Sequence, residues 1–391
     1  MNYCLEYKYM KIGFSYKGVR VSLSRNAEHA AHIFSRLKQK DETILANFWK
    51  TWTPLVHSPL VTHLKYCNFK QLECKEILYT TKRTLIEPLS IFIGRGDHPL
   101  RGSVKLPITP YDVTVNTAQT IAPPPCGMRW SCSIRDPGAH WWGRYTDSAG
   151  LTKYLYNQPD TEQIKQKFDV ARKLRRKLPA VRKLYVNLLQ SSCQRKRQIG
   201  CVLYLIDVTC IRVGHSKDTS VCANSVGACT LRKEHVFLKP DSLHLKFLGK
   251  DSILFDRLIS CSNAGVLKCL AESMKKKHNT DELFHLIDAC DINETLQDVD
   301  SRFTAKVFRT FHASAMLQKL LQRCKENPAN HYKSSIQKVA AHCNHTTTST
   351  TKANYIDPRI VYAYCAKHSI APERCITGHE WARCTPASFV F

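Results

Sequence analysis

The chain has 391 residues, enough to bury a sizeable core and to form two or three domains. Its 58 Lys and Arg residues against 32 Asp and Glu residues give a formal net charge of +26. Positive charges in such excess repel one another in the folded chain, which favours a polyanionic partner. Duplex nucleic acid is such a polyanion, because it carries one negative charge per about 1.7 Å of axis. A basic protein without such a partner is the alternative. No apolar run approaches the roughly 20 residues that span a bilayer, so a membrane protein is not expected.

The 18 cysteines are spread along the chain, with no Cys-x-x-Cys pair and no signal-peptide pattern at the N-terminus. We interpret them as reduced thiols of an intracellular protein. The nearest approach to metal-ligand spacing is His342-Cys343-Asn344-His345, where a zinc site is the minor alternative and no metal is expected.

The first 80 residues alternate short apolar or aromatic runs with helical patterns over 27–38 and 44–52, which predicts a small mixed α/β unit. The next stretch, from 85 to 116, is dense in glycine, proline and β-forming residues. Strands that carry aromatic and basic residues are expected around Arg129-Trp130 and Trp141–Tyr145.

Within residues 85–116, the sequence Ile91-Phe-Ile-Gly-Arg-Gly-Asp-His-Pro99 places two glycines around Arg95. Glycine lets the backbone approach a ligand closely, and the guanidinium between the two glycines can then point at that ligand. As an isolated pattern, an ordinary turn is the favoured explanation.

Residues 161–190 predict a strongly basic amphipathic helix, in which Lys and Arg alternate with apolar residues. Charge runs are commonly solvated faces, but the net charge favours a helix that lies along phosphates. Pro179 is expected to kink or divide this helix.

An apolar helix over 202–213 is expected to deliver Arg212 near its end. Strands follow around 230–238 and 242–248, and a tight Gly-Lys-Asp-Ser turn after the second strand leaves Lys250 at its tip. An arginine that ends a helix can simply cap it, and most turn lysines are solvated.

Residues 303–322 predict an amphipathic helix with Lys306, Arg309 and His312 on one polar stripe. A further helix over 334–343 ends just before His345, and the Ser/Thr-rich run that follows reads as a flexible connector.

Tyr355 then precedes Asp357-Pro358, a sequence that starts helices because Asp caps and Pro needs no hydrogen-bond acceptor in the first turn. His345 and Tyr355 must therefore lie close in space.

Taken in order, Arg212, Lys250, Arg309, His345 and Tyr355 resemble the five reactive positions of eukaryotic type IB DNA topoisomerases. The resemblance covers nearly the whole chain. The local sequences that carry it are Tyr204-Leu-Ile-Asp207, Ile211-Arg-Val-Gly214, Phe247-Leu-Gly-Lys-Asp-Ser252, Leu283-Phe284, Thr304-Ala-Lys-Val-Phe-Arg-Thr310, Cys343-Asn-His345, Asn354-Tyr-Ile-Asp-Pro-Arg359 and the upstream Gly94-Arg-Gly-Asp-His-Pro99.

The resemblance implies an α+β multidomain clamp. Its N-terminal half would be mixed α/β, and its catalytic domain would be mainly helical, of the tyrosine-recombinase/type IB topoisomerase type, with a small antiparallel sheet. The expected parts are a cap subdomain over 1–80, a second clamp subdomain over 81–165, a catalytic core over 166–345, a short linker over 346–354 and a C-terminal domain over 355–391 that carries the tyrosine.

The side chains themselves indicate a chemistry. A phenol with a pKa near 10 attacks a phosphodiester only if the charge of the transition state is neutralised in place. Arg212 and Arg309 suit the two nonbridging oxygens, His345 Nε2 can donate a third hydrogen bond, and Lys250 can protonate the leaving 5′ oxygen. Tyr355 would form a 3′-phosphotyrosyl bond that reseals without ATP. Because the arginines replace a metal, no cofactor is expected.

By resemblance, DNA contacts would also come from Arg95, Lys217, Asn344, Asn354 and Asp251. The partner would be double-stranded DNA in the nucleus, the enzyme an isomerase that acts as a monomer, and camptothecin-like inhibitors would stack beside Arg95, Asp251 and Asn354. Compared with the family, the charged N-terminal region is absent and the linker is reduced to nine residues, which predicts less hindered strand rotation.

Two alternatives remain open. A tyrosine recombinase uses the same five roles, but its histidine usually stands where this chain has Lys306, and it lacks the Gly-Arg-Gly-Asp-His-Pro sequence. A non-catalytic basic DNA-binding paralogue would need no reactive residues, whereas here all five positions are filled.

Overall fold

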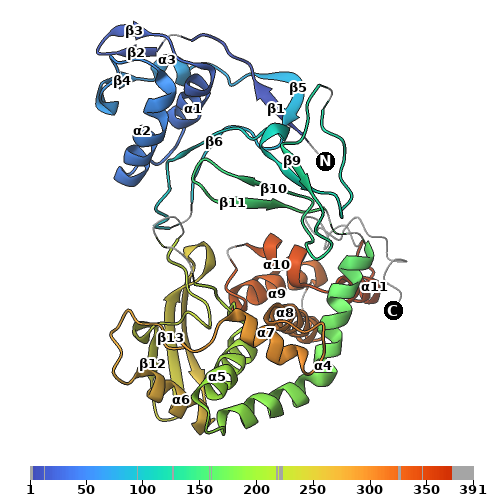
Figure 1. Cartoon of the computed structure of the whole chain (residues 1–391). Helices are drawn as coiled ribbons and strands as arrows, with labels where there is room; N and C mark the ends of the chain where they lie inside the picture. Colours follow the sequence, from blue (N-terminus) through green and yellow to red (C-terminus); the bar gives the residue numbers. More distant parts are fainter. Residues whose placement is uncertain are drawn as a thin grey trace. The chain divides into compact units, whose positions relative to one another are not determined.

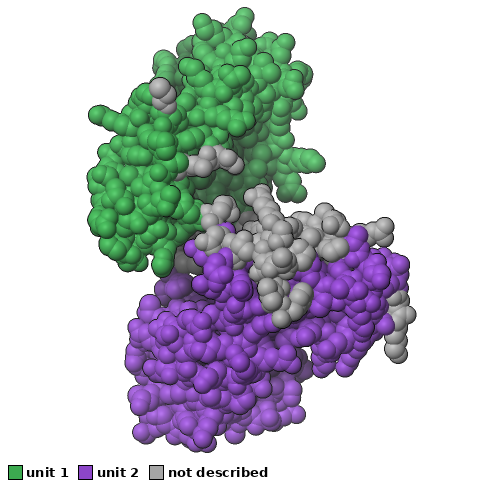
Figure 2. Space-filling view, turned by 90° about the vertical axis from the view of Figure 1, so that its right-hand side faces the viewer, with its two compact units in different colours: residues 1–158, 218–223 green, residues 159–217, 224–391 purple. Residues whose placement is uncertain are grey.

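The computed structural model describes residues 3–12, 14–94, 96–125, 127–157, 159, 161–216, 219, 223–324, 327–345 and 347–371. The chain divides into two compact units (Figure 2). The first unit comprises Met1–Gln158 with Asp218–Ala223, and the second comprises Pro159–Lys217 with Asn224–Phe391. Each unit has its own hydrophobic core.

The first unit begins with a small α/β layer. Its elements are β1 (Cys4–Tyr7), β2 (Phe14–Tyr16), β3 (Val19–Val21), α1 (Arg25–Ser35), α2 (Glu42–Val56), β4 (Cys67–Asn68), α3 (Lys70–Glu73) and β5 (Tyr79–Leu85). The β1 strand pairs antiparallel with β5, and β2 pairs with both β3 and β4. Ser24 and Asp41 cap α1 and α2 by accepting from backbone N–H groups, so both predicted helices are confirmed with shifted ends.

The rest of the first unit is mainly β. Its strands are β6 (Ser90–Ile91), β7 (Val104–Lys105), β8 (Thr114–Asn116), β9 (Cys132–Ile134), β10 (Gly143–Thr146) and β11 (Thr152–Leu155). A four-stranded sheet has the order β11-β10-β8-β9, in which only β8 and β9 run parallel. The strand expected at Trp141–Tyr145 is present as β10, whereas Arg129 and Trp130 precede β9 outside any strand.

The segment after β6 is fixed on α2. Asn47 Nδ2 donates to the carbonyls of Pro99 at 2.6 Å and Arg101 at 2.8 Å. Gly102 has a φ of +90°, and a Cβ at this position would lie 2.3 Å from the Ile44 carbonyl oxygen. Only glycine allows so close an approach, so the chain just after the Gly-Arg-Gly-Asp-His-Pro sequence is held against a helix.

The second unit is mainly helical with one small sheet (Figure 1). Its elements are α4 (Thr161–Leu189), α5 (Gln194–Thr209), β12 (Val236–Leu238), β13 (Ser242–Leu248), β14 (Leu254–Ser260), α6 (Ala264–Met274), α7 (Ala289–Gln297), α8 (Ala305–Leu321), α9 (Pro328–His342), α10 (Thr348–Tyr355) and α11 (Pro358–Lys367). Helix α8 lies among α4, α5, α7, α9, α10 and α11, and it is therefore the central element of this unit.

A buried carboxylate ties three of these helices together. Asp207 of α5 accepts from Arg182 Nε at 2.9 Å, from the Tyr185 hydroxyl at 3.2 Å and from His312 Nε2 at 2.9 Å. Burial would raise the pKa of this carboxyl, but hydrogen bonds from His312 and Arg182 lower it below its usual value. This ionised hub fixes α4, α5 and α8 relative to one another.

Several predictions for the second unit need correction. Helix α4 continues through Pro179, so of the expected kink or division only the division is wrong. Helix α5 ends at Thr209, because Cys210 takes a left-handed conformation with a φ of +58°, so Arg212 lies on the segment after the helix. The Ser/Thr-rich run was expected to be flexible, yet residues 348–355 form α10, which packs on α8 and α9.

The basic helix α4 also differs from the expectation of a phosphate-facing stripe. Arg172 pairs with Asp357 at 2.7 Å, Lys173 pairs with Asp300, and Arg182 belongs to the Asp207 hub. These three cations therefore stabilise their own unit. Other cations of the helix are exposed, namely Arg175, Arg176, Lys177 and Lys183.

No helix among the described residues is long and apolar enough to cross a lipid bilayer.

Candidate active site

Tyr355 is the last residue of α10, and its backbone is fixed on α8. Ser314 Oγ donates to the Tyr355 carbonyl at 2.9 Å and accepts from the Asp357 N–H at 3.0 Å. Asp357 in turn caps α11 by accepting from the Arg359 N–H at 3.0 Å, as the Asp-Pro sequence predicted. The tyrosine is thus positioned by two helix ends, and its side chain is 5% exposed.

Arg309 of α8 is buried beside this tyrosine. Its guanidinium donates to the Cys210 carbonyl and, at 3.0 Å, to the Cys343 carbonyl. Its Cζ lies 5.3 Å from the centre of the Tyr355 ring. Two carbonyls from distant parts of the chain therefore fix a permanent cation against the phenol.

His345 follows α9 and stacks on Tyr355, with ring centres 4.7 Å apart and planes inclined by 24°. Arg309 donates to His345 Nε2 at 2.6 Å, and an arginine nitrogen can only donate. His345 Nδ1 lies 2.8 Å from Thr351 Oγ1, whose hydroxyl donates to the Thr347 carbonyl at 3.4 Å. The Arg309 contact requires Nε2 to accept and so assigns the proton to Nδ1 in this structure, which differs from the expectation that Nε2 donates.

Arg212 reaches the site from the segment that follows α5. This segment pairs with residues 226–229, since the Ala228 N–H donates to the Arg212 carbonyl at 2.8 Å and the Cys229 N–H donates to the Val213 carbonyl at 2.7 Å. A Cβ on Gly227 would lie 2.5 Å from the Gly214 backbone, so small residues allow this pairing.

Lys250 reaches the site from the turn between β13 and β14. That turn is closed by the Gly249 N–H, which donates to the Ile253 carbonyl at 2.9 Å. Asp251 and Ser252 both adopt left-handed conformations, with φ values of +62° and +55°. The predicted strand over 242–248 and the predicted tight turn are both confirmed.

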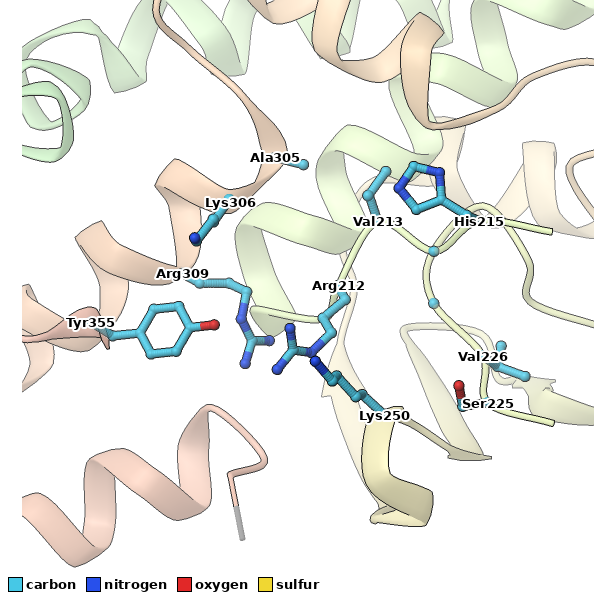
Figure 3. Close-up of a pocket in the computed structure, with 12 residues that line it drawn as sticks. Arg212, Val213, His215, Ser225, Val226, Lys250, Ala305, Lys306, Arg309 and Tyr355 are labelled. Atoms are coloured by element: carbon cyan, nitrogen blue, oxygen red, sulfur yellow. The ribbon is translucent and has the colours of Figure 1, made fainter. Parts of the chain in front are cut away.

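Four of the five predicted reactive residues line one pocket of about 350 Å³ (Figure 3). The Tyr355 hydroxyl points toward the Arg309 guanidinium, and the cationic groups of Arg212 and Lys250 lie beyond it. His345 contacts both Arg309 and Tyr355, so the structure brings all five together.

The electrostatics of the pocket act on both rings. Burial would raise the pKa of the Tyr355 hydroxyl, but the charges of Arg309 and Arg212 hold it below its usual value. Burial, together with the same two charges, lowers the pKa of His345 to about 3. Near pH 7 the imidazole is therefore neutral, and the phenol loses its proton more readily than an ordinary tyrosine does.

The predicted DNA contacts are only partly described. Arg95 and Lys217 lie outside the described residues. Asn344 follows α9 with a φ of +52°, Asn354 Nδ2 donates to the Thr350 carbonyl at 3.3 Å, and Asp251 stands in the Lys250 turn.

The zinc alternative at His342–His345 gains no support. Across the described part of the chain, no three His, Cys, Asp or Glu side chains are grouped to hold a metal ion. His342 instead lies 3.7 Å from the Cys210 sulfur, measured from Nε2.

Sequence reasoning missed two supporting residues: Thr351 holds His345, and Ser314 holds the Tyr355 backbone. Lys306, expected on the same polar stripe as Arg309, lines the pocket. Thr351 stands four residues before Tyr355, a helical spacing that could have placed both on one face. That signal was hidden because the run looked like a connector.

The fold and the pocket define a class: a strongly basic α/β protein whose tyrosine is set among fixed cations. Three family models match the chain: "Eukaryotic DNA topoisomerase I, DNA binding fragment" over 79–157, "Eukaryotic DNA topoisomerase I, catalytic core" over 157–360, and "C-terminal topoisomerase domain" over 333–391. The chain belongs to the eukaryotic DNA topoisomerase I family.

Individual relatives agree with this assignment. The chain is 29% identical to DNA topoisomerase I, mitochondrial, of Rattus norvegicus, with 85% of this chain and 67% of that protein covered. It is 29% identical to DNA topoisomerase 1 of Homo sapiens and 30% identical to that of Caenorhabditis elegans, covering 52% and 50% of those proteins. The chain thus spans about half to two thirds of the length of these relatives.

Proposed function

We propose that the chain is a type IB DNA topoisomerase that relaxes supercoiled duplex DNA through a transient single-strand break, without ATP or a metal ion. The observation that carries this proposal is the gathering of Arg212, Lys250, Arg309 and His345 around the Tyr355 hydroxyl. Neither a recombinase nor a non-catalytic paralogue is favoured by any feature of this site.

In the proposed cleavage step, Tyr355 Oη attacks a backbone phosphorus, and the bond from phosphorus to the 5′ oxygen breaks. The nonbridging oxygens gain charge in the transition state, and Arg309 and Arg212 neutralise it. Both guanidiniums already lower the pKa of the attacking phenol. The product keeps the energy of a phosphodiester as a 3′-phosphotyrosyl bond, so the free 5′ hydroxyl can reverse the reaction.

Lys250 is the proposed general acid. Its exposed ammonium stands on a turn at the edge of the pocket, where it can donate a proton to the leaving 5′ oxygen. Expulsion of an unprotonated alkoxide is the harder half of the step, so this proton accelerates cleavage. Lys306 lines the same pocket and adds a further positive charge toward the phosphate.

His345 is proposed to donate a hydrogen bond to the phosphate from Nε2. This role needs the proton on Nε2, whereas Nε2 accepts from Arg309 in this structure. Thr351 supports either tautomer, since its hydroxyl can accept from Nδ1–H or donate to a bare Nδ1. When Arg309 turns its donor to a phosphate oxygen, the histidine proton can move to Nε2 while Thr351 holds the ring in place.

The remaining predictions belong to this proposal. The first unit would close with the second around a duplex as a clamp, with the Gly-Arg-Gly-Asp-His-Pro loop carrying Arg95 to the DNA. That clamp would comprise the five predicted parts, namely 1–80, 81–165, 166–345, 346–354 and 355–391. Further DNA contacts would come from Lys217, Asn344, Asn354 and Asp251 and from the exposed cations of α4. Camptothecin-like inhibitors would stack beside the break. The protein would act as a monomer.

The nine-residue segment between His345 and Tyr355 replaces the long linker that the family resemblance implies. Most of this segment forms α10, which packs on the catalytic helices. We expect strand rotation to meet less friction than in linker-bearing relatives, and single-molecule supercoil release that is equally slow would contradict this.

The proposed compartment is the nucleus, although the relatives include proteins named as mitochondrial. Imaging of a tagged chain tests it.

The deciding experiment is relaxation of a negatively supercoiled plasmid by the purified chain in EDTA without ATP. Relaxation is expected, together with a covalent protein–DNA complex when denaturant stops the reaction. Tyr355→Phe should abolish both while leaving salt-sensitive DNA binding intact. Binding without relaxation by the unsubstituted chain would overturn the enzymatic proposal and favour a DNA-binding role.

A further inference from the structure

Two buried thiols lie directly behind the catalytic arginine. The carbonyls of Cys210 and Cys343 are the two backbone acceptors that hold the Arg309 guanidinium. Their side chains are each 1% exposed, and the two thiols lie close enough for each to shift the pKa of the other. The residues that hold Arg309 through their backbones therefore also bring their thiols near one another.

The surroundings of the pair favour thiol chemistry. His342 Nε2 lies 3.7 Å from the Cys210 sulfur. Arg257 of β14 donates to the His342 carbonyl at 2.7 Å and to the Ala341 carbonyl, so a second guanidinium flanks the pair. The hydrogen bond from Cys210, opposed by burial and helped by the Arg309 and Arg257 charges, lowers the pKa of Cys343. Low-pKa thiols in cationic surroundings are those that oxidants attack.

We propose that Cys210 and Cys343 are a reversible modification site, in which a peroxide converts the two thiols into a disulfide that withdraws Arg309 from its catalytic position. Formation of the disulfide is independent of the proposed function. Only the expected effect of the disulfide on DNA relaxation rests on that function.

The reaction balances with a peroxide as the oxidant. The Cys343 thiolate attacks one peroxide oxygen, the O–O bond breaks, and a sulfenic acid and one water form. The Cys210 sulfur then attacks the Cys343 sulfur, the S–OH bond breaks, and the second water leaves as the disulfide forms. Two thiols lose two electrons and two protons, and one peroxide becomes two waters. A dithiol reductant reverses the step by thiol–disulfide exchange.

The disulfide would act on catalysis through the backbone. An S–S bond of about 2.05 Å is much shorter than any non-bonded contact between two sulfurs, so the end of α5 and the end of α9 must move closer together. Both ends carry a carbonyl that fixes Arg309, and the arginine Nε has no other partner in the described residues. Displaced carbonyls would misplace the guanidinium, and errors of about 1 Å at a catalytic group can cost on the order of a hundredfold in rate.

The chain offers a matched control pair. Cys201 of α5 and Cys269 of α6 are also buried, at 0% and 2% exposed, and their thiols also shift the pKa of each other. This pair belongs to the hydrophobic core of the second unit, and neither cysteine holds Arg309. Oxidation at Cys201 would leave the Arg309 carbonyls in place.

The test treats the full chain with hydrogen peroxide, blocks remaining thiols and digests it with trypsin without reduction. Trypsin should release peptide 198–212, which holds both Cys201 and Cys210, and peptide 339–352, which holds Cys343. We expect these peptides to be cross-linked in the unsubstituted chain and in Cys201→Ala, but not in Cys210→Ala. Absence of the cross-link in the unsubstituted chain would overturn the proposal whether or not the protein is a topoisomerase.

Relaxation rates give the functional half of the test, with each variant compared with its own reduced form. We expect peroxide to slow the unsubstituted chain and Cys201→Ala at least tenfold, dithiothreitol to restore both, and Cys210→Ala to lose less than twofold. An equal loss in Cys210→Ala would assign the inactivation to another oxidation and overturn the switch.

Discussion

Among the described residues, two buried tyrosine–histidine pairs are stacked, one in each unit, and their neighbours give them opposite properties. In the first unit, Tyr7 stacks on His29 with ring centres 4.3 Å apart. In the second, Tyr355 stacks on His345 with ring centres 4.7 Å apart. Both tyrosines are 5% exposed.

The difference lies in the charge that each phenol meets. Tyr7 donates to the buried carboxylate of Glu28 at 2.7 Å, and Glu28 also accepts from the N–H groups of Met10 at 2.9 Å and Ile12 at 2.6 Å. Burial and this carboxylate raise the pKa of Tyr7 far above its ordinary value. The Tyr7 hydroxyl is therefore a structural donor that joins β1 to α1. At Tyr355 the neighbours are arginines, and the pKa moves down.

The comparison shows that neither the aromatic stack nor burial makes a phenol reactive. Burial opposes ionisation at both tyrosines, and only the sign of the surrounding charge distinguishes them. Equivalent substitutions in the two stacks should therefore have different effects on DNA relaxation and on stability.

The sharpest test removes the hydroxyl from each tyrosine. Tyr355→Phe deletes the proposed nucleophile, so relaxation should fall by at least about 10⁴-fold, as for nucleophile deletions in other enzymes. Plasmid relaxation and trapping of the covalent complex measure the loss.

Tyr7→Phe is the matched control. It leaves Glu28 with one hydrogen bond fewer, so we expect a loss of about 1–3 kcal/mol in unfolding free energy and normal relaxation where the chain is folded. If Tyr7→Phe abolished covalent trapping as fully as Tyr355→Phe, the contrast between the two stacks would be wrong.

The second test replaces the Arg309 guanidinium beside the Tyr355 stack with a lysine ammonium. A lysine at 309 cannot bond two carbonyls and His345 together, so Arg309→Lys should slow single-turnover cleavage about 10²- to 10³-fold. Lysine keeps the positive charge that lowers the pKa of Tyr355, so the loss of rate should come from the missing hydrogen bonds rather than from the ionisation of the phenol.

Arg182→Lys makes the same substitution in the Asp207 hub and should change cleavage less than threefold. An equal loss in both variants would point to a general packing defect.

The sequence predicted the local parts of this arrangement well. The start of α11 at Asp357-Pro358 and the strand β13 follow from capping chemistry and from alternation, which are signals of neighbouring residues. The gathering of the five reactive residues was inferred from family resemblance, because no periodicity joins segments so far apart.

Other features depend on contacts that no local pattern contains. Arg309 was expected on a polar stripe, but it is buried because Cys210 and Cys343, 99 and 34 residues away, supply its acceptors. The Ser/Thr run forms α10 because Thr347 caps it and because it packs on α8 and α9. Tertiary packing here overrides weak helix propensity.

The third test concerns pH and the histidine of the first stack. Burial lowers the pKa of His29 to about 4 from an ordinary value of 6.5, and the nearby His32 adds to the shift. The folded chain thus holds His29 neutral, and its contribution to stability is present above pH 6.5. It is lost as pH falls from 6.5 to about 4, because the unfolded chain binds the proton first. The shift corresponds to about 3 kcal/mol.

His29→Phe keeps a flat ring against Tyr7 and cannot ionise, and His29 Nε2 has no hydrogen-bond partner among the described residues. Denaturant unfolding of the full chain at pH 7 and pH 4.5 should show a smaller loss of stability in this variant. Identical pH dependence in the two chains would mean that His29 does not titrate with unfolding.

The smallest expected effect comes from the support of the second stack. Thr351→Val keeps the shape of the side chain but leaves His345 Nδ1 without its hydroxyl partner, so cleavage should slow about tenfold, near the low end for groups that orient a reactive residue. Thr351→Ser retains the hydroxyl and should restore the rate, which a purely steric role of the methyl group would not allow. A freed imidazole would also lose the hydrogen bond that orients its ring, so the pH profile of cleavage should change in Thr351→Val and not in Thr351→Ser. Equal rates and profiles in the three chains would show that stacking on Tyr355 suffices to position His345.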